Sequence, residues 1–142
     1  MNTTATYIPK NLVVVVGGVI INGFTDDDFF TVERNEDIFT TKVGANGDVV
    51  RSKSSNYTGI ITLKLLQTSP VNLVLSELFK TYYPDQAGLE ILSFAAKEGD
   101  FTVVYAAECW LKTTPKMNYG KEAGDREWVL EAKELQYTIG GT

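Results

Sequence analysis

The sequence predicts a mainly β protein, an antiparallel β-sandwich or barrel of about seven or eight strands with one flanking α-helix. Three observations support this fold class. Short runs rich in β-branched and aromatic residues recur along the chain, turn signals separate these runs, and one segment has helical periodicity. The 142 residues suit one domain, and 44% apolar with 22% charged residues is typical of a globular chain.

The first half of the chain contains a series of predicted short strands. A β-branched run, 12–16, resumes at 19–21 after a Gly-Gly break, which is typical of strands buried on both faces or bent at a bulge. Further strands are expected at 28–34 and 38–43. The Asn-Gly pair within residues 45–48 then indicates a tight hairpin turn.

A clean alternation follows over residues 57–67, which places Ile61, Leu63 and Leu65 on one face of a strand, toward a core.

The one convincing helix is expected over residues 70–83. Ser69 can cap its N-terminus, while Pro70 takes the first helical position, where a missing N–H costs nothing. Leu73 breaks the apolar stripe of this helix. The stripe itself consists of Val71, Val74, Leu75, Leu78, Phe79 and Tyr82.

The chain returns to strands after the helix. A Gly-Asp turn at 99–100 joins the first two of them, and a loop at 113–125 precedes the last one, in which apolar and charged residues alternate. These strands are expected at 89–97, 101–110 and 127–139. The whole chain, 1–142, is expected to form one domain with an N-terminal arm at 1–10.

Several kinds of chemistry are excluded by composition. The chain has no histidine, so it offers no imidazole metal ligand and no Ser-His or Cys-His nucleophile pair. Cys109 is the only cysteine, which excludes an intrachain disulfide and a structural zinc site. We interpret Cys109 as a small buried apolar residue. Catalysis and a bound cofactor are therefore not expected.

The charge balance and the apolar segments bear on partners. Thirteen basic and 18 acidic residues give a net charge of −5, the wrong sign for holding nucleic acid through its phosphates. The longest apolar run, 12–21, is too short to span a bilayer, and its flanks match a signal peptide poorly. We expect a cytoplasmic product with no membrane partner.

Three clusters of side chains are candidate sites. Asp26, Asp27 and Asp28 could offer oxygens to a cation, but consecutive residues entering a strand point in alternating directions. Glu33, Glu36 and Asp37 could supply paired carboxylates, but a polar turn fixes no separation between them. Both clusters are better explained as solvated surface. Five aromatics could form a stacking platform but are more typical of core or cross-strand pairs: Tyr82, Tyr83, Tyr105, Trp110 and Trp128.

One pattern of charge is less easily dismissed. Residues 44–56 are expected to form a projecting hairpin loop that carries Arg51 and Lys53, whereas the loops at 26–28 and 33–37 are acidic. Opposite charges on separate loops suit self-complementary stacking. The alternative, a solvated loop with unpaired charges, fits the residues equally well.

One set of residues in the first half of the chain forms a recognisable pattern. It consists of Gly23-Phe24, Asp28-Phe29, Val32, Arg34, Asp37, Gly44, Gly47, Val49, Arg51-Ser52-Lys53, and residues 59–72 with Leu75 and Leu78. In these residues the chain resembles the tail tube proteins of contractile-tailed bacteriophages. The resemblance is specific between about residues 7 and 78, and from residue 89 onward it rests on length and strand pattern alone.

This resemblance implies a structural virion protein that is not an enzyme. Six copies would form a ring, and stacked rings would make the rigid inner tube of a phage tail, assembled in the bacterial cytoplasm, through which the genome is delivered. The implied partners are further copies, a tail sheath protein, baseplate or tube-initiator and terminator proteins, and a tape-measure protein. DNA would pass through the lumen without specific binding, because six chains at −5 give −30 per ring.

Heterologous stacking of identical rings requires complementary faces. The residues expected to make this contact are Asp48, Arg51 and Lys53 against Asp26, Asp27, Asp28, Glu33 and Asp37. Two alternatives remain open at this stage. The same subunit could serve the tube of a headless, tailocin-like injection particle, or the chain could be a monomeric ligand- or carbohydrate-binding β-sandwich that stacks sugars on Trp110 or Trp128.

Overall fold

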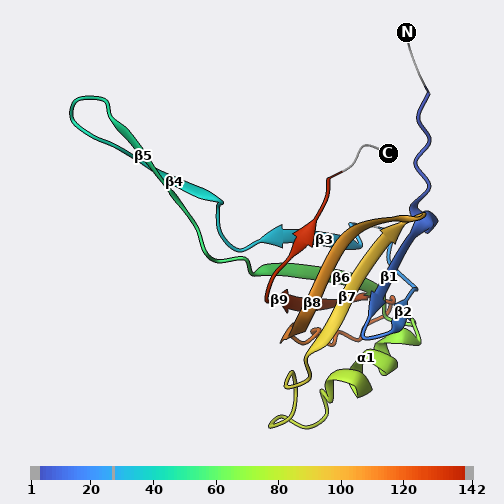
Figure 1. Ribbon diagram of the computed structural model, residues 1–142. Helices are drawn as coiled ribbons and strands as arrows, with labels where there is room; N and C mark the ends of the chain where they lie inside the picture. Colours follow the sequence, from blue (N-terminus) through green and yellow to red (C-terminus); the bar gives the residue numbers. More distant parts are fainter. Residues whose placement is uncertain (1–3, 27, 140–142) are drawn as a thin grey trace.

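One antiparallel sheet and one α-helix dominate the computed structural model, which describes residues 4–26 and 28–139 (Figure 1). The predicted fold class is confirmed. The elements in chain order are η1 (Pro9–Asn11), β1 (Leu12–Val16), β2 (Val19–Ile21), β3 (Phe30–Arg34), β4 (Phe39–Val43), β5 (Val49–Lys53), β6 (Gly59–Leu66), α1 (Val71–Phe79), β7 (Leu92–Glu98), β8 (Phe101–Thr113), β9 (Asp125–Ala132) and β10 (Gln136–Tyr137).

The main sheet is bent over on itself. Its strand order is β2-β1-β7-β8-β9-β6-β3, and β10 pairs with part of β8. Phe30 on β3 and Phe94 on β7 are separated by three strands in this order, yet their ring centroids lie 5.9 Å apart. The two halves of the sheet therefore face each other across a core, as in a barrel that stays open between its edge strands β2 and β3.

The core is built from the inward-facing residues of alternating strands. On β6, every second residue from Gly59 to Leu65 is buried, as the alternation predicts. The antiparallel register sets Ile61 opposite Leu130 and Leu63 opposite Trp128 of β9. Each of these pairs has both side chains on the core face, so this part of the sheet has one dry face.

Helix α1 closes one end of the core through Val71, Leu75 and Phe79, which are all buried. The rings of Phe79 and Trp128 are 6.4 Å apart, so the helix packs directly on β9. No helix within residues 4–26 and 28–139 is long and apolar enough to cross a bilayer.

The helix begins near the predicted residue but ends earlier. Pro70 already has helical backbone angles, and the Ser69 hydroxyl accepts a hydrogen bond from the Val71 N–H at 3.4 Å. The predicted end at residue 83 is wrong, because Lys80 adopts a left-handed conformation (φ 52°) that terminates α1 at Phe79. Tyr82 consequently lies outside the helix and is exposed.

Two further boundaries differ from prediction. The Gly-Gly break between β1 and β2 is a tight hairpin turn and not a bulge, since both glycines have positive φ and Val16 pairs with Val19. The last predicted strand, 127–139, is split. Leu135 turns into the core between β9 and β10, and its N–H donates to the Tyr57 carbonyl at 3.0 Å, which releases β10 to pair with β8.

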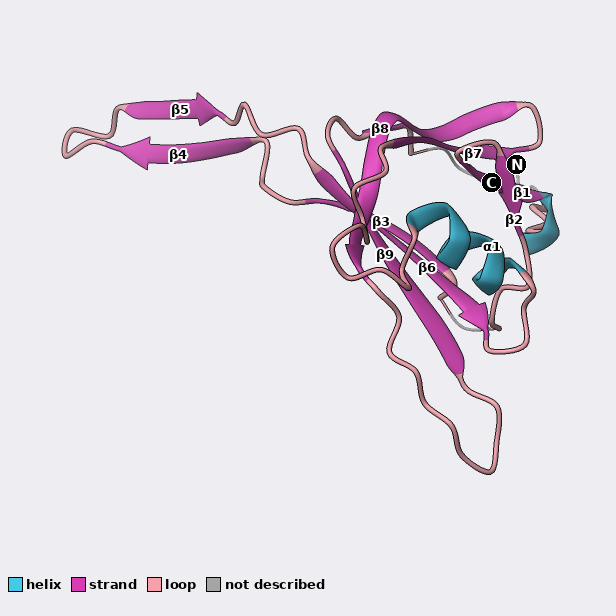
Figure 2. Ribbon diagram, turned by 90° about the horizontal axis from the view of Figure 1, so that it is seen from below, coloured by secondary structure: helices cyan, strands magenta, loops and turns pink. Residues whose placement is uncertain are grey.

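Strands β4 and β5 form a two-stranded hairpin that projects away from the main sheet (Figures 1 and 2). Every residue from 38 to 53 is exposed. The expected loop at 44–56 is therefore only partly loop, since residues 49–53 are the second strand of this hairpin. Gly47 (φ 89°) lies in its turn, as the Asn-Gly signal indicates.

Candidate functional site

The projecting hairpin, residues 38–54, carries a net positive charge, and we refer to it as the basic hairpin. It contains three basic residues, Lys42, Arg51 and Lys53, and one acidic residue, Asp48, so its net charge is +2. Since the net charge of the whole chain is −5, the remaining residues together carry −7. The Arg51 guanidinium lies 4.7 Å from the centroid of the Phe39 ring. This cation–π contact holds the arginine against the hairpin and leaves it exposed to a partner.

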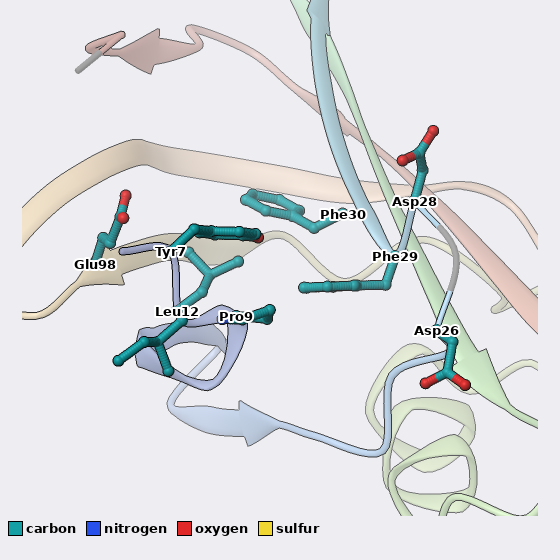
Figure 3. Close-up of a pocket in the computed structure, with 9 residues that line it drawn as sticks. Tyr7, Pro9, Leu12, Asp26, Asp28, Phe29, Phe30 and Glu98 are labelled. Atoms are coloured by element: carbon teal, nitrogen blue, oxygen red, sulfur yellow. The ribbon is translucent and has the colours of Figure 1, made fainter. Parts of the chain in front are cut away.

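A second surface combines apolar residues with carboxylates. This acidic pocket has a volume of about 480 Å³ and lies between the N-terminal segment, β1, β3 and the end of β7. Figure 3 shows the Phe29 and Phe30 rings pointing into it, with Asp26 and Asp28 along one rim and Glu98 on the other. Its lining residues are Tyr7, Ile8, Pro9, Leu12, Asp26, Asp28, Phe29, Phe30 and Glu98.

An apolar floor with a carboxylate rim suits a long, positively charged side chain. The methylene stem of an arginine or lysine can lie on the aromatic rings while its charged head meets the acids. The pocket is not arranged for a metal ion, since the described residues include no group of three or more His, Cys, Asp or Glu side chains that could hold one. The pocket therefore combines exposed carboxylates with an aromatic surface, a setting that suits a basic side chain.

The two surfaces lie at opposite ends of the same strands. The acidic pocket begins at Phe30, which pairs with Leu63, whereas the basic hairpin follows Arg34, which pairs with Gly59. The four residue steps between them span about 13 Å, and the hairpin extends further in the same direction. A single copy therefore has the acidic pocket at one end of β3. The hairpin of β4 and β5 projects beyond the other end (Figure 1).

The sequence-predicted contact residues divide between these two ends. Asp26 and Asp28 reach the acidic pocket, and Asp27 lies outside the described residues. Asp48, Arg51 and Lys53 are exposed on the basic hairpin.

Glu33 and Asp37 belong to the hairpin end of the molecule. Glu33 is exposed on β3, and Asp37 shares a depression of about 220 Å³ with Lys53 at the hairpin base. The neighbouring Glu36 accepts a hydrogen bond from the Ser54 hydroxyl at 2.8 Å. Glu36 and Asp37 thus lie beside Arg34 and Lys53 of their own copy.

The aromatic residues do not gather into a stacking platform. Trp128 is only 2% exposed, and its indole N–H donates to Asn72 Oδ1 at 3.0 Å. Tyr82 and Tyr83 form an exposed edge-to-face pair with centroids 4.7 Å apart, on the turns after α1. Cys109 is buried as predicted, and burial raises the pKa of its thiol to about 12.

Sequence reasoning missed several residues of the acidic pocket. Tyr7 and Glu98 come from segments about 90 residues apart, and the antiparallel pairing of Leu12 with Glu98 brings the segment before β1 close to the end of β7. No local pattern carries that information. Phe29 and Phe30 lie in the predicted strand 28–34, directly after Asp28. This adjacency of two aromatic residues and a carboxylate is the local signal that could have indicated an apolar floor with an acidic rim.

Comparisons with known proteins place the chain in a family. The family model described as bacteriophage PhiTE tail tube protein matches residues 12–140. A curated relative, structural protein ORF10 of Pseudomonas phage KPP10, is 26% identical over 145 residues, which cover 97% of this chain and 84% of that protein.

Solved structures share the fold at low sequence identity. A chain in the tail of an empty GTA particle, refined with C6 symmetry, has a TM-score of 0.61 at 14% identity, covering 94% of this chain and all of that one. A chain of the sheath-tube complex of PVC, an extracellular contractile injection system, has a TM-score of 0.59 at 16% identity. The match covers 96% of this chain and all of that one. A chain of the anti-feeding prophage cap has a TM-score of 0.59 at 12% identity. The match covers 99% of this chain and 95% of that one.

Proposed function

Because the chain belongs to the family of the bacteriophage PhiTE tail tube protein, a structural family and not an enzymatic one, we propose that six copies form a ring and that stacked rings form the tail tube. The genome would be delivered through this tube. The observation that carries the proposal is the placement of the basic hairpin and the acidic pocket at opposite ends of one subunit.

Complementary surfaces at opposite ends produce head-to-tail association. Such contacts are heterologous: each copy uses its hairpin on one neighbour and its pocket on another, so the assembly continues through every copy. We propose that Arg51 and Lys53 of one ring meet Asp26, Asp28 and their neighbour Asp27 of the next ring. Glu33 and Asp37 are less suitable partners, because they lie at the hairpin end of the same copy.

Ring closure has its own physical reason. Strands β2 and β3 are the edges of the main sheet. Among residues 4–26 and 28–139, no strand pairs with the outer side of either one. An exposed edge favours uncontrolled pairing with other chains. A ring in which neighbouring copies cover these edges removes the hazard and makes the wall continuous.

The remaining partners follow from a place in a tail. We propose a tail sheath protein outside the tube, baseplate or tube-initiator and terminator proteins at its ends, and a tape-measure protein within. Assembly would occur in the cytoplasm of the bacterial host. With −30 per hexameric ring, the charge facing the bore would repel DNA phosphates, and the genome would pass without being held.

The test is a charge reversal on the basic hairpin. Arg51→Glu should give a soluble, folded chain that no longer forms tubes under negative-stain electron microscopy, because the reversed charge would face the acidic pocket. Lys97→Glu on β7 is the matched control, since Lys97 is also exposed but lies away from the hairpin. Normal tubes from Arg51→Glu would dismiss this contact.

A tube for a headless contractile particle is also compatible with the fold, because solved neighbours include a chain of an extracellular contractile injection system. Electron microscopy of the native particles distinguishes the two, since only a phage tail joins a DNA-filled head.

A further inference from the structure

Arg126 is a buried cation with an unusual setting. It is 7% exposed and lies on the same face of β9 as the buried residues Trp128 and Leu130. Its partner on the neighbouring strand β6 is Leu65. A charged residue on such a face is expected to have a counter-charge, because burial removes its hydration.

The partners of Arg126 within the chain are all neutral. Its guanidinium donates to the backbone carbonyls of Asp125 (3.1 Å) and Asn118 (3.4 Å) and lies 5.4 Å from the centroid of the Tyr119 ring. No carboxylate of the described residues lies within ion-pair distance of it. The arginine is therefore held by neutral partners, and its guanidinium makes no ion pair with the described residues.

This arginine lines a groove between α1 and the loop of residues 113–125. The groove has a volume of about 520 Å³, and its other walls combine neutral polar residues with apolar and aromatic ones. Leu73 on α1 is 66% exposed there, and Met117 and Tyr119 on the loop are also exposed. A fitting occupant would have apolar side chains and one negative charge.

The tip of the basic hairpin, residues 43–50, has this composition. Val43, Val49 and Val50 are exposed, and Asp48 is the one charged residue of the tip. The turn is narrow because Gly44 and Gly47 bear no side chains, and it is closed by the bond from the Gly44 N–H to the Asp48 carbonyl at 2.7 Å. A thin tip with exposed valines and one carboxylate thus complements a groove with exposed apolar side chains and one cation.

We propose that this groove receives the hairpin tip of a second copy, with the Asp48 carboxylate paired to the Arg126 guanidinium. A chain cannot fill its own groove, because the hairpin joins β6 at Gly59 whereas Arg126 pairs near the opposite end of that strand. The inference rests on the proposed head-to-tail assembly and names a second receptor within it.

A charge swap tests the pairing. Asp48→Arg and Arg126→Glu should each raise the protein concentration needed for tube formation by about tenfold or more, since each places like charges together. The double variant should return this concentration toward that of the unmodified chain. Thermal melting of the monomers controls for misfolding of the buried variant, and normal assembly of Asp48→Arg, whose site is exposed, would overturn the proposal.

Cysteine cross-linking tests the location without touching a buried residue. A chain carrying Asp48→Cys and Met117→Cys should give a ladder of covalent oligomers when its tubes are oxidised, while buried Cys109 stays free. Asp48→Cys with Tyr105→Cys, on β8, is the control and should give at most dimers. Tubes without the Met117 ladder would overturn this inference and leave the proposed function standing, whereas an unmodified chain that never assembles would overturn both.

Discussion

At the residue scale, Gly59 is required by a close approach and not by an unusual backbone angle. A Cβ at this position would lie 2.3 Å from Leu135 Cδ2 and 3.0 Å from the Glu33 carbonyl oxygen. Leu135 is buried at this point, in the short connection between β9 and β10. We expect Gly59→Ala to destabilise the fold by about 1–3 kcal/mol, because the core must shift to admit the methyl group.

Denaturant unfolding of the purified monomer measures this effect. Gly120→Ala is the matched control, since a Cβ there meets nothing within 4 Å, and it should change the free energy of unfolding by less than about 0.5 kcal/mol. Equal stability of the two variants would show that Leu135 does not pack on Gly59.

Cys109 gives a pH-dependent prediction. Burial raises the pKa of its thiol from 9.0 to about 12, so the folded state holds this proton when the unfolded state has lost it. Above about pH 9, this group alone should lower the free energy of unfolding by about 1.4 kcal/mol per pH unit. Cys109→Ala should remove that component of the slope, and identical slopes for both proteins between pH 9 and the folded-state pKa would contradict the burial of the thiol.

At the scale of elements, helix α1 has one face in the core and one in the groove. Leu75→Ala should cost about 2–5 kcal/mol of unfolding free energy, because Leu75 is buried beneath the helix. Leu73→Ala, two residues away and exposed, should cost less than about 0.5 kcal/mol. Thermal or denaturant unfolding of the two monomeric variants checks this contrast, and comparable losses would mean that α1 is rotated about its axis.

The basic hairpin contributes no buried residue to the core, so it should be removable. Ser54 donates its N–H to the Ile38 carbonyl at 2.8 Å, which makes this pair a natural point at which to shorten the hairpin. Replacing residues 39–53 by Asn-Gly should leave the melting temperature of the monomer nearly unchanged while abolishing tubes. A large fall in melting temperature would show that the hairpin stabilises the fold of its own chain.

Elements with local signals could be predicted from the sequence, and those set by tertiary contacts could not. The alternation of β6 and the Ser69-Pro70 start of α1 depend on neighbouring residues alone, and both are present as expected. The helix ends at Lys80 in a left-handed conformation, where no glycine marked the end. The split of the last strand depends on Leu135 meeting Gly59, two residues about 75 positions apart.

The same distinction applies to the candidate site. The opposite charges of residues 26–28 and of Arg51 are visible in the sequence, whereas the ends at which they lie follow from the register of β3 with β6. Arg126 precedes Trp128 and Leu130 at the same two-residue spacing, so the alternation of this strand indicates that Arg126 lies on the buried face. The neutrality of its partners could be learned only from the fold.

At the scale of the whole molecule, assembly should depend on salt. Contacts between the basic hairpin and an acidic pocket are partly exposed, so added ions screen them. Raising the salt from about 0.05 M to about 0.5 M should increase the protein concentration needed for tubes severalfold. Arg51→Gln should need more protein at low salt and show a shallower salt dependence, as measured by sedimentation of tubes. A steeper dependence in this variant would exclude the assigned role of Arg51.

The central claim is that a single copy is an incomplete part of a head-to-tail assembly. Negative-stain electron microscopy of the purified, unmodified chain over a wide range of concentrations tests this most directly. The account predicts hollow tubes whose end views have sixfold symmetry, together with rings at lower concentration. Monodisperse monomers at every concentration would contradict it.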